Sequence, residues 1–332
     1  MLGYIAHRLL VMIPTLFIIS ILVFIIIQLP PGDYLTTMMA ELQSQGETLS
    51  QERMEFYRQE YGFGLPMHEQ YFIWFTGLLQ GNLGYSFEHE LPVTEVIGDR
   101  AFLTVVVSMS TIIFVYVMSF PIAVYSAVNQ YSVGDYVLTF IGFIGLAVPN
   151  FLLALVLMYL ANTYFGTSIG GLMDDHLRNE PMSWEKIVSI LEHLWVPVIV
   201  IGTSGTAGMI RRLRANLLDE LHKQYVVTAK AKGVPPGKAL IKYPVRMAIN
   251  PFVADIGNVL PEIISGSAIV AVVLSLETTG PMLLQALQSQ DMYLAGSFLM
   301  FVAMLTVIGT LVSDIALGFL DPRIRLGAEV SK

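Results

Sequence analysis

The 332-residue chain contains no cysteine, which excludes a disulfide framework, a thiolate metal site and a cysteine nucleophile. Charged residues are also scarce, at 13% of the chain, whereas soluble domains carry about 25%. In their place, 55% of the residues are hydrophobic, including 18 Phe, 15 Tyr and 17 Met. So much apolar surface excludes a disordered chain and argues against two ordinary soluble domains.

The sequence also lacks the motifs that mark enzymes, such as HExxH, GxSxG or paired carboxylates. The run Gly233-Val-Pro-Pro-Gly237-Lys238-Ala239 is one residue too short for a phosphate loop, and Ala239 has no hydroxyl for Mg²⁺. Gly202, Gly205 and Gly208 lie in an apolar helical stretch, where small residues permit close helix contact and a dinucleotide site is not expected. We expect no catalytic residues, no metal site and no cofactor in this chain.

Long apolar runs predict membrane-spanning helices, because crossing the hydrocarbon layer takes about 20 apolar residues. We therefore expect an all-α polytopic membrane protein with six transmembrane helices. The expected segments are 1–29 (the N-terminus and the first helix, whose apolar run is 9–29), 101–128, 137–165, 194–210, 251–276 and 293–320. The third contains Pro149-Asn150, so we expect one tilted, kinked helix, with two half-helices as the alternative. The first run is too long for a signal-peptide core and predicts an uncleaved anchor.

The basic residues give the orientation. Nine of the 18 Lys and Arg lie between Arg211 and Arg246, so the positive-inside rule places the loop 211–250 in the cytoplasm. Six spans would put both termini on that side, with 321–332 as a cytoplasmic tail. The translocated segment 30–100 is too long for a connector and predicts a small external subdomain. Within it, residues 69–79 predict an aromatic amphipathic helix at the membrane interface, in preference to a dedicated binding surface.

The loop 211–250 has the pattern of a docking element. It predicts a helix through Lys232, a stop at Gly233, a Pro-Pro turn, and a second short helix from Gly237 to about Tyr243. A long, basic and structured loop between two spans does more than tether them.

This loop resembles a known motif. The run Tyr225-Val-Val-Thr228-Ala229-Lys-Ala231-Lys-Gly233, followed by Arg246-Met-Ala-Ile-Asn-Pro251, is similar to the EAA loop of binding-protein-dependent ABC importer permeases, in the form of the oligopeptide, dipeptide and nickel permease family. Further pieces resemble that family in order along nearly the whole chain: Leu29-Pro-Pro-Gly32-Asp33, Tyr61-Gly-Phe-Gly-Leu-Pro66, Gln70-Tyr71, Gly81-Asn-Leu-Gly84-Tyr-Ser86-Phe87, Pro149-Asn-Phe151, Asp291-Met-Tyr293 and Asp321-Pro322-Arg323.

The resemblance implies a type I ABC importer permease fold in the bacterial inner membrane. It implies a second homologous permease, two ATPase subunits that bind ATP and Mg²⁺, an external solute-binding protein and membrane lipid as partners, and no nucleic acid. The residues that it assigns to ATPase coupling are Tyr225, Thr228, Ala229, Ala231, Lys232, Gly233, Lys238 and Tyr243. Val227 stands where the motif ordinarily has Glu, and Gln224 where an Asp is common.

One acidic residue falls within the fifth expected span. Glu262 lies about 11 residues, some 16 Å, beyond Pro251, and a charge at mid-bilayer costs about 2.5–3.5 kcal/mol. We expect Glu262 to face the translocation pathway together with Asn258 and Ser265, with a local hydrogen-bonded pair to Asn258 as the alternative.

The resemblance implies import of peptides or similar oligomeric solutes. An oligosaccharide is the alternative, because Ala271 and Glu277-Thr-Thr-Gly280-Pro281 replace the Glu and the Pro-Gly-x-Gly turn of peptide-type members. A rival from another class is a self-sufficient secondary transporter, which predicts charged relays or broken helices repeated in both halves.

Overall fold

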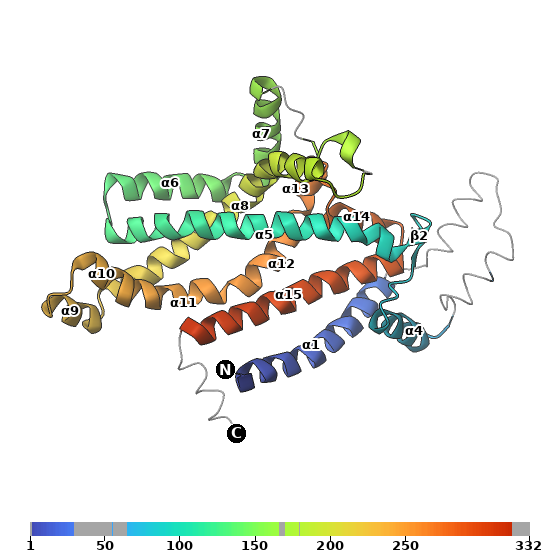
Figure 1. Cartoon of the computed structure of the whole chain (residues 1–332), viewed down its shortest axis with the longest axis horizontal. Coiled ribbons are helices and arrows are strands. Elements are labelled where there is room, and N and C mark those ends of the chain that lie inside the picture. Colours follow the sequence, from blue (N-terminus) through green and yellow to red (C-terminus); the bar gives the residue numbers. More distant parts are fainter. Residues whose placement is uncertain (1, 30–54, 56–64, 166–169, 179, 321–332) are drawn as a thin grey trace. The chain divides into compact units, whose positions relative to one another are not determined.

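The computed structural model describes residues 2–29, 55, 65–165, 170–178 and 180–320. These residues are helical almost throughout (Figure 1). Their strands are Tyr85–Ser86 (β1) and Leu91–Pro92 (β2), which pair antiparallel. The predicted tail 321–332 and most of the segment 30–64 lie outside the described residues.

Four described helices have the length and apolar character to cross a membrane: α1 (Leu2–Gln28), α5 (Val93–Val128), α8 (Trp184–Leu221) and α15 (Met292–Leu320). The pair α6 (Val133–Ala147) and α7 (Asn150–Phe165) adds a fifth if it forms one broken span. The described residues thus confirm an all-α protein with four or five candidate spans. The count of six stays a prediction.

The third expected span is two helices. The axes of α6 and α7 meet at 102°, so the prediction of one kinked helix was wrong and the alternative of two half-helices holds. The break falls at Val148, which adopts an extended conformation (φ −84°, ψ 122°). Proline disfavours the helical conformation of the residue before it, and Pro149 follows Val148.

The fifth expected span is also interrupted. Residues 251–276 do not form one helix, because α11 (Arg246–Ala254), α12 (Ile256–Gly266) and α13 (Ala268–Val273) follow one another as short pieces. Pro251 and Pro261 have no N–H to donate to a helical hydrogen bond, and glycine lowers the stability of a helix; the pieces meet at Asp255 and Ser267. At the first break the Ser313 hydroxyl donates to the carbonyls of Val253 and Ala254, both at 2.9 Å. This neighbouring side chain satisfies carbonyls near the end of α11.

The fourth expected span, 194–210, lies inside a much longer helix. α8 begins ten residues earlier, where the Ser183 side chain caps it by accepting from the Lys186 N–H (3.2 Å). It continues through Leu221, and therefore includes the first eleven residues of the predicted loop 211–250. After α13 the chain forms α14 (Thr279–Gln288) and then α15.

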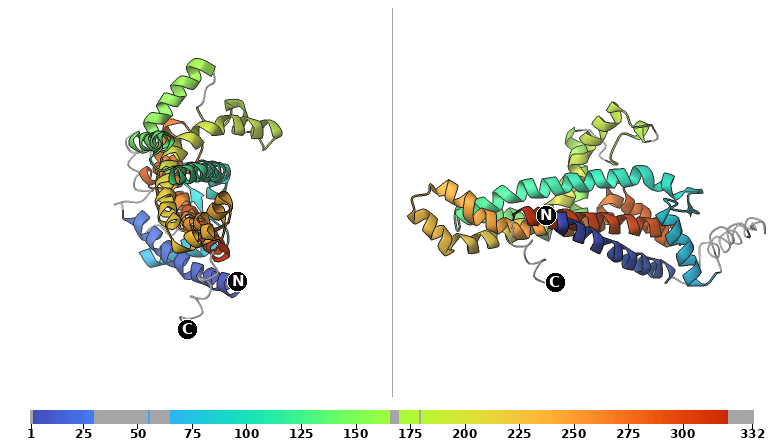
Figure 2. Two further views of the ribbon diagram at one scale, coloured as in Figure 1. Left: turned by 90° about the vertical axis from the view of Figure 1, so that its left-hand side faces the viewer. Right: turned by 60° about the horizontal axis from the view of Figure 1, so that its bottom comes forward.

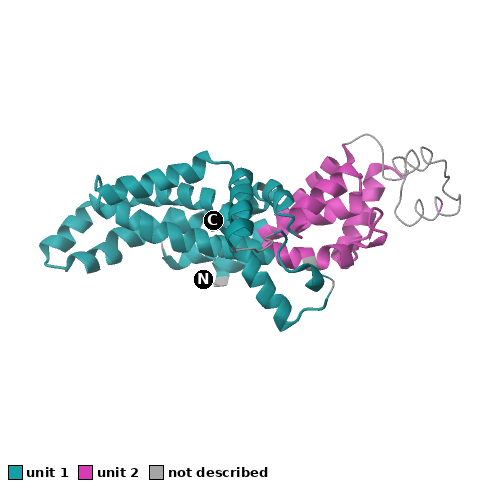
Figure 3. Cartoon of the chain, turned by 90° about the horizontal axis from the view of Figure 1, so that it is seen from above, with its two compact units in different colours: residues 1–9, 105–276, 306–332 teal, residues 10–104, 277–305 magenta. Residues whose placement is uncertain are grey.

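The described chain divides into two compact units (Figure 3). Unit 1 comprises residues 1–9, 105–276 and 306–332, and unit 2 comprises residues 10–104 and 277–305. In unit 1, α8 contacts α6, α7 and α11. A Cβ at Gly202 would lie 2.6 Å from Phe114, and one at Gly205 3.3 Å from Val115. These two glycines therefore permit the predicted close helix contact, whereas a Cβ at Gly208 would have no neighbour within 4 Å.

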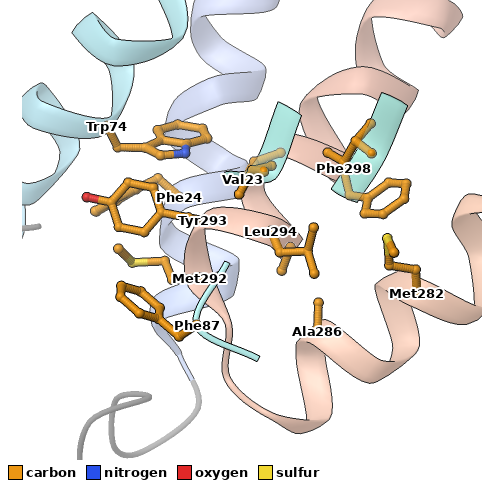
Figure 4. Close-up of a cluster of buried hydrophobic side chains, with 13 residues drawn as sticks. Val23, Phe24, Trp74, Phe87, Met282, Ala286, Met292, Tyr293, Leu294 and Phe298 are labelled. Carbon is orange, nitrogen blue, oxygen red and sulfur yellow. The ribbon is translucent and has the colours of Figure 1, made fainter. Parts of the chain in front are cut away.

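Unit 2 has an aromatic core (Figure 4). The helix predicted over residues 69–79 is present as α4 (Met67–Leu79). Its Trp74, 2% exposed, lies 5.6 Å from the ring of Phe24 in α1. The same cluster contains Phe87, Tyr293 and Phe298, and Figure 4 shows Trp74, Phe24 and Tyr293 close together. The inner face of α4 thus packs against protein, while Phe72 and Leu79 stay exposed.

Asp291 joins the strand pair to α15. Ser86 Oγ donates to Asp291 Oδ2 (2.7 Å), and the Leu294 N–H donates to Asp291 Oδ1 (3.1 Å). Burial raises the pKa of the Asp291 carboxyl, although these hydrogen bonds oppose the shift. Gly84 lies close by with φ +83°, and a Cβ there would fall 2.1 Å from the Tyr293 ring. The pieces Gly84-Tyr-Ser86 and Asp291-Met-Tyr293, more than 200 residues apart, therefore form one structural unit.

Candidate functional site

The first part of the candidate site is a helical hairpin between α8 and α11 (Figures 1 and 2). It consists of α9 (Gln224–Ala231) and α10 (Pro236–Leu240), and α10 continues through a π-helical turn, Ile241–Val245, into α11. The predicted two-helix element is present. Its second helix does not end near Tyr243, because the helical path runs on to Ala254.

Gly233 ends α9 with a Schellman motif. Its N–H donates to the Lys230 carbonyl (2.9 Å), and the Val234 N–H donates to the Ala229 carbonyl (3.2 Å). This turn requires the left-handed conformation that Gly233 adopts, with φ +76°. Glycine takes that conformation without the steric cost that a Cβ brings. The stop predicted at Gly233 is confirmed.

The hairpin has a buried side and an exposed side. Val226, Ala229 and Ala239 are buried, at 5% exposure or less. The exposed side combines apolar Val227 (53%) and Ile241 (70%) with four exposed lysines: Lys230, Lys232, Lys238 and Lys242. The exposed side therefore presents both apolar and cationic side chains.

The eight predicted coupling residues divide between these two sides. Tyr225, Thr228, Ala231, Lys232, Gly233 and Lys238 are exposed, Tyr243 is half-buried and Ala229 is buried. The Tyr225 hydroxyl donates to the Glu220 carboxylate. Partial burial, followed by this carboxylate, raises the pKa of the Tyr225 phenol and keeps it protonated. Ala229 contributes to packing within the hairpin.

The second part of the site is a cavity of about 620 Å³ inside unit 1. Residues of α5, α6, α7, α8 and α12 line it. Glu262 of α12 is among them and is exposed; its role in the pathway stays a prediction. Asn258 and Ser265 lie on the same helix, but their side chains are outside the described structure.

Polar residues of α7 and α8 that the sequence analysis missed also line this cavity. Asn150 Nδ2 donates to Ser204 Oγ (3.3 Å), and both face the cavity with Arg211 and Arg212. Arg212 forms an ion pair with Asp255 (2.6 Å) at the break between α11 and α12. Along α8 the lining residues Ile201, Ser204, Gly208, Arg211 and Ala215 recur at helical spacing. This helical period indicates from the sequence which face of α8 lines the cavity, but the sequence analysis places Arg211 and Arg212 in the loop 211–250.

Two family models match the chain. Residues 119–326 match the binding-protein-dependent transport system inner membrane component, and residues 1–110 match the N-terminal model of the corresponding membrane component. The chain belongs to this inner membrane component family. The resemblance to ABC importer permeases is thereby confirmed.

Curated relatives of this inner membrane component match along their whole length. The oligopeptide transport system permease protein AppB of Bacillus subtilis is 33% identical over 98% of the chain and 99% of the relative. The dipeptide transport system permease protein DppB of Escherichia coli K12 is 28% identical, with 98% and 99% covered. The oligopeptide transport system permease protein OppB of Haemophilus influenzae is 27% identical, with 98% and 100% covered.

The family assignment narrows the function. The inner membrane component is a transport subunit of an ABC importer, not an enzyme, and is a multi-pass protein of the inner membrane. A self-sufficient secondary transporter, the rival interpretation of the sequence, is inconsistent with this membership.

Proposed function

We propose that this chain forms one half of the translocation pathway of an ATP-driven peptide importer. A second homologous permease supplies the other half, a solute-binding protein delivers the peptide, and two cytoplasmic ATPases, which bind ATP and Mg²⁺, drive the cycle. The observation that carries the proposal is the exposed hairpin of α9 and α10, which is joined through α8 on one side and through α11 and α12 on the other to helices that line the cavity. The relatives named for oligopeptide and dipeptide transport support the solute class.

The hairpin is mechanically connected to the cavity. α8 runs without a break from the cavity residue Ser204 to Leu221 at the base of the hairpin, a length of about 26 Å at about 1.5 Å per residue. On the return path α11 leads to α12, which carries Glu262. A partner that displaces the hairpin therefore acts on two of the helices that line the cavity, α8 and α12.

The charges of the cavity favour a peptide over an oligosaccharide. Glu262 of α12 supplies an anion to the cavity, whereas Arg212 and Asp255 neutralise each other. This anion complements the charged amino terminus of a peptide, whereas a neutral sugar would leave it without a counter-charge.

The test is uptake by proteoliposomes that contain the chain alone or with its permease, ATPase and binding-protein partners. We expect peptide uptake only with all partners and ATP. Uptake by the chain alone, or by the full complex without ATP hydrolysis, would contradict the proposal. Uptake of oligosaccharides but not peptides would contradict the solute class only.

A further inference from the structure

A second cavity, of about 250 Å³, lies between α6 and α8 in unit 1. Tyr136, Thr139 and Phe143 line its α6 side, and Ala207 and Ile210 line its α8 side. We call this cavity the α6–α8 groove. The transport cycle described above assigns no role to it.

The groove combines apolar and charged residues. The two helices are antiparallel: Gly142 of α6 approaches Ala207 of α8, while Asp135 near the start of α6 pairs with Arg214 toward the end of α8. Leu146, Ala207 and Ile210 make one part apolar. The Asp135–Arg214 pair and Tyr131 line the groove toward the beginning of α6, whereas the Arg211 guanidinium lies over the Phe143 ring, farther along this helix.

The groove as a whole carries a net positive charge. Arg214 Nε and Nη2 donate to the two oxygens of Asp135 at 3.1 and 2.8 Å, so this buried pair is neutral and fixed. Arg211 is exposed, and its guanidinium carbon lies 5.6 Å from the Phe143 ring centroid. With no described carboxylate beside Arg211, one positive charge remains. A guanidinium of this kind can donate two parallel hydrogen bonds to a phosphate.

Two tyrosines line the groove. Tyr131 is 71% exposed and Tyr136 is 61% exposed, as is common for tyrosine at the membrane–water interface. Tyr131 has φ +64°, a conformation that is strained for an aromatic residue. Its N–H donates to Asp135 Oδ2 (3.0 Å). The same carboxylate therefore holds both Arg214 and this strained turn in place.

The other side of α6 is suited to lipid. Val137, Phe140, Ile141 and Ile144 are exposed and belong to a helix that forms part of a candidate membrane span. A groove on such a helix that combines apolar residues with the Arg211 cation matches the two parts of a phospholipid.

We propose that the α6–α8 groove binds an anionic phospholipid from the leaflet on the hairpin side. The phosphate of its headgroup pairs with Arg211, and part of an acyl chain lies along Leu146, Ala207 and Ile210. Arg211 also lines the 620 Å³ cavity, so a solute carboxylate is the competing ligand that the experiment must distinguish.

The test measures lipid retained by the purified importer complex. Complexes with wild-type chain, Arg211→Gln, Arg211→Lys or Arg246→Gln are reconstituted in nanodiscs of phosphatidylcholine with a minor fraction of phosphatidylglycerol. They are then re-extracted in mild detergent, and the bound lipid is quantified by mass spectrometry. Arg246 is an exposed cation at the start of α11 and lines neither cavity, so Arg246→Gln controls for the loss of one positive charge.

We expect wild type and Arg246→Gln to retain phosphatidylglycerol preferentially, Arg211→Gln to retain at least fivefold less, and Arg211→Lys to keep at least half of the wild-type amount. Equal retention in Arg211→Gln, or equal retention of phosphatidylcholine and phosphatidylglycerol, would overturn the proposal. Displacement of the lipid by saturating transported peptide would assign Arg211 to the solute instead. The retention measurements require neither ATP nor uptake, so they can overturn the lipid proposal while the proposed transport function stands.

Discussion

At the scale of single residues, Gly84 shows how strongly the fold constrains one position. Alanine there must adopt φ +83° and bring its Cβ within 2.1 Å of the Tyr293 ring. We expect Gly84→Ala to destabilise unit 2 by about 2–4 kcal/mol, since overpacking and left-handed strain add. Gly81→Ala is the matched control, because Gly81 has φ +78° but no atom within 4 Å of its Cβ. Thermal unfolding in detergent should show a much smaller loss for Gly81→Ala, and equal losses would contradict the proposed contact.

The proposed role of Glu262 in the translocation pathway can be tested by substitution. It lines the 620 Å³ cavity from α12. We expect Glu262→Gln to lower peptide uptake at least threefold without changing assembly, because the cavity loses its anion while the side chain keeps its shape. Asp219→Asn, an exposed carboxylate of α8 that does not line the cavity, should leave uptake unchanged. If Glu262→Gln transports and selects peptides as wild type does, Glu262 is not part of the pathway.

At the scale of elements, the turn after α9 sets the geometry of the hairpin. A valine at position 233 must either stay in the left-handed region, which costs about 1–2 kcal/mol, or leave it and move the chain that leads into α10. We expect Gly233→Val to leave the ATPases active while uptake falls about tenfold, because the hairpin no longer fits its partner. Gly237→Ala, in the same hairpin at a position without positive φ, should transport normally. Wild-type uptake by Gly233→Val in a coupled hydrolysis and uptake assay would refute the docking assignment.

Elements with a local signal could be predicted from the sequence. Helix α4, the two helices of the hairpin and the stop at Gly233 all follow from nearby residues. The interruption of the fifth span was not predicted, because mean hydropathy over a window measures composition and is insensitive to breaks such as those at Asp255 and Ser267.

Features that depend on tertiary contacts were not predictable. The bond between Ser86 and Asp291 joins residues 205 positions apart, and nothing local in the chain indicates it. Arg211 and Arg212 were counted as loop cations, because the positive-inside rule uses their charge but not the helix face on which they lie. Their place in the cavity depends on the extension of α8 beyond residue 210.

At the scale of the whole molecule, orientation across the membrane is the property most open to experiment, because the natural chain has no cysteine to remove. Lys223→Cys, exposed at the start of α9, and Asp175→Cys, whose native side chain is 90% exposed, each introduce one thiol. We expect a membrane-impermeant maleimide to label Asp175→Cys in intact spheroplasts, and Lys223→Cys only in inverted vesicles. Labelling of both from the same side would contradict the predicted topology.

The two helical connections that flank the hairpin differ in a way that has a mechanical consequence. On one side α8 is a single helix, whereas on the other side the chain forms the separate helices α11, α12 and α13, which meet at Asp255 and Ser267. A single helix moves as one piece, but consecutive short helices can each turn by a different amount. We therefore expect a displacement of the hairpin to shift α8, which bears Arg211, as one piece and to rotate α12, which bears Glu262, so that one stroke changes the shape of the passage as well as its width.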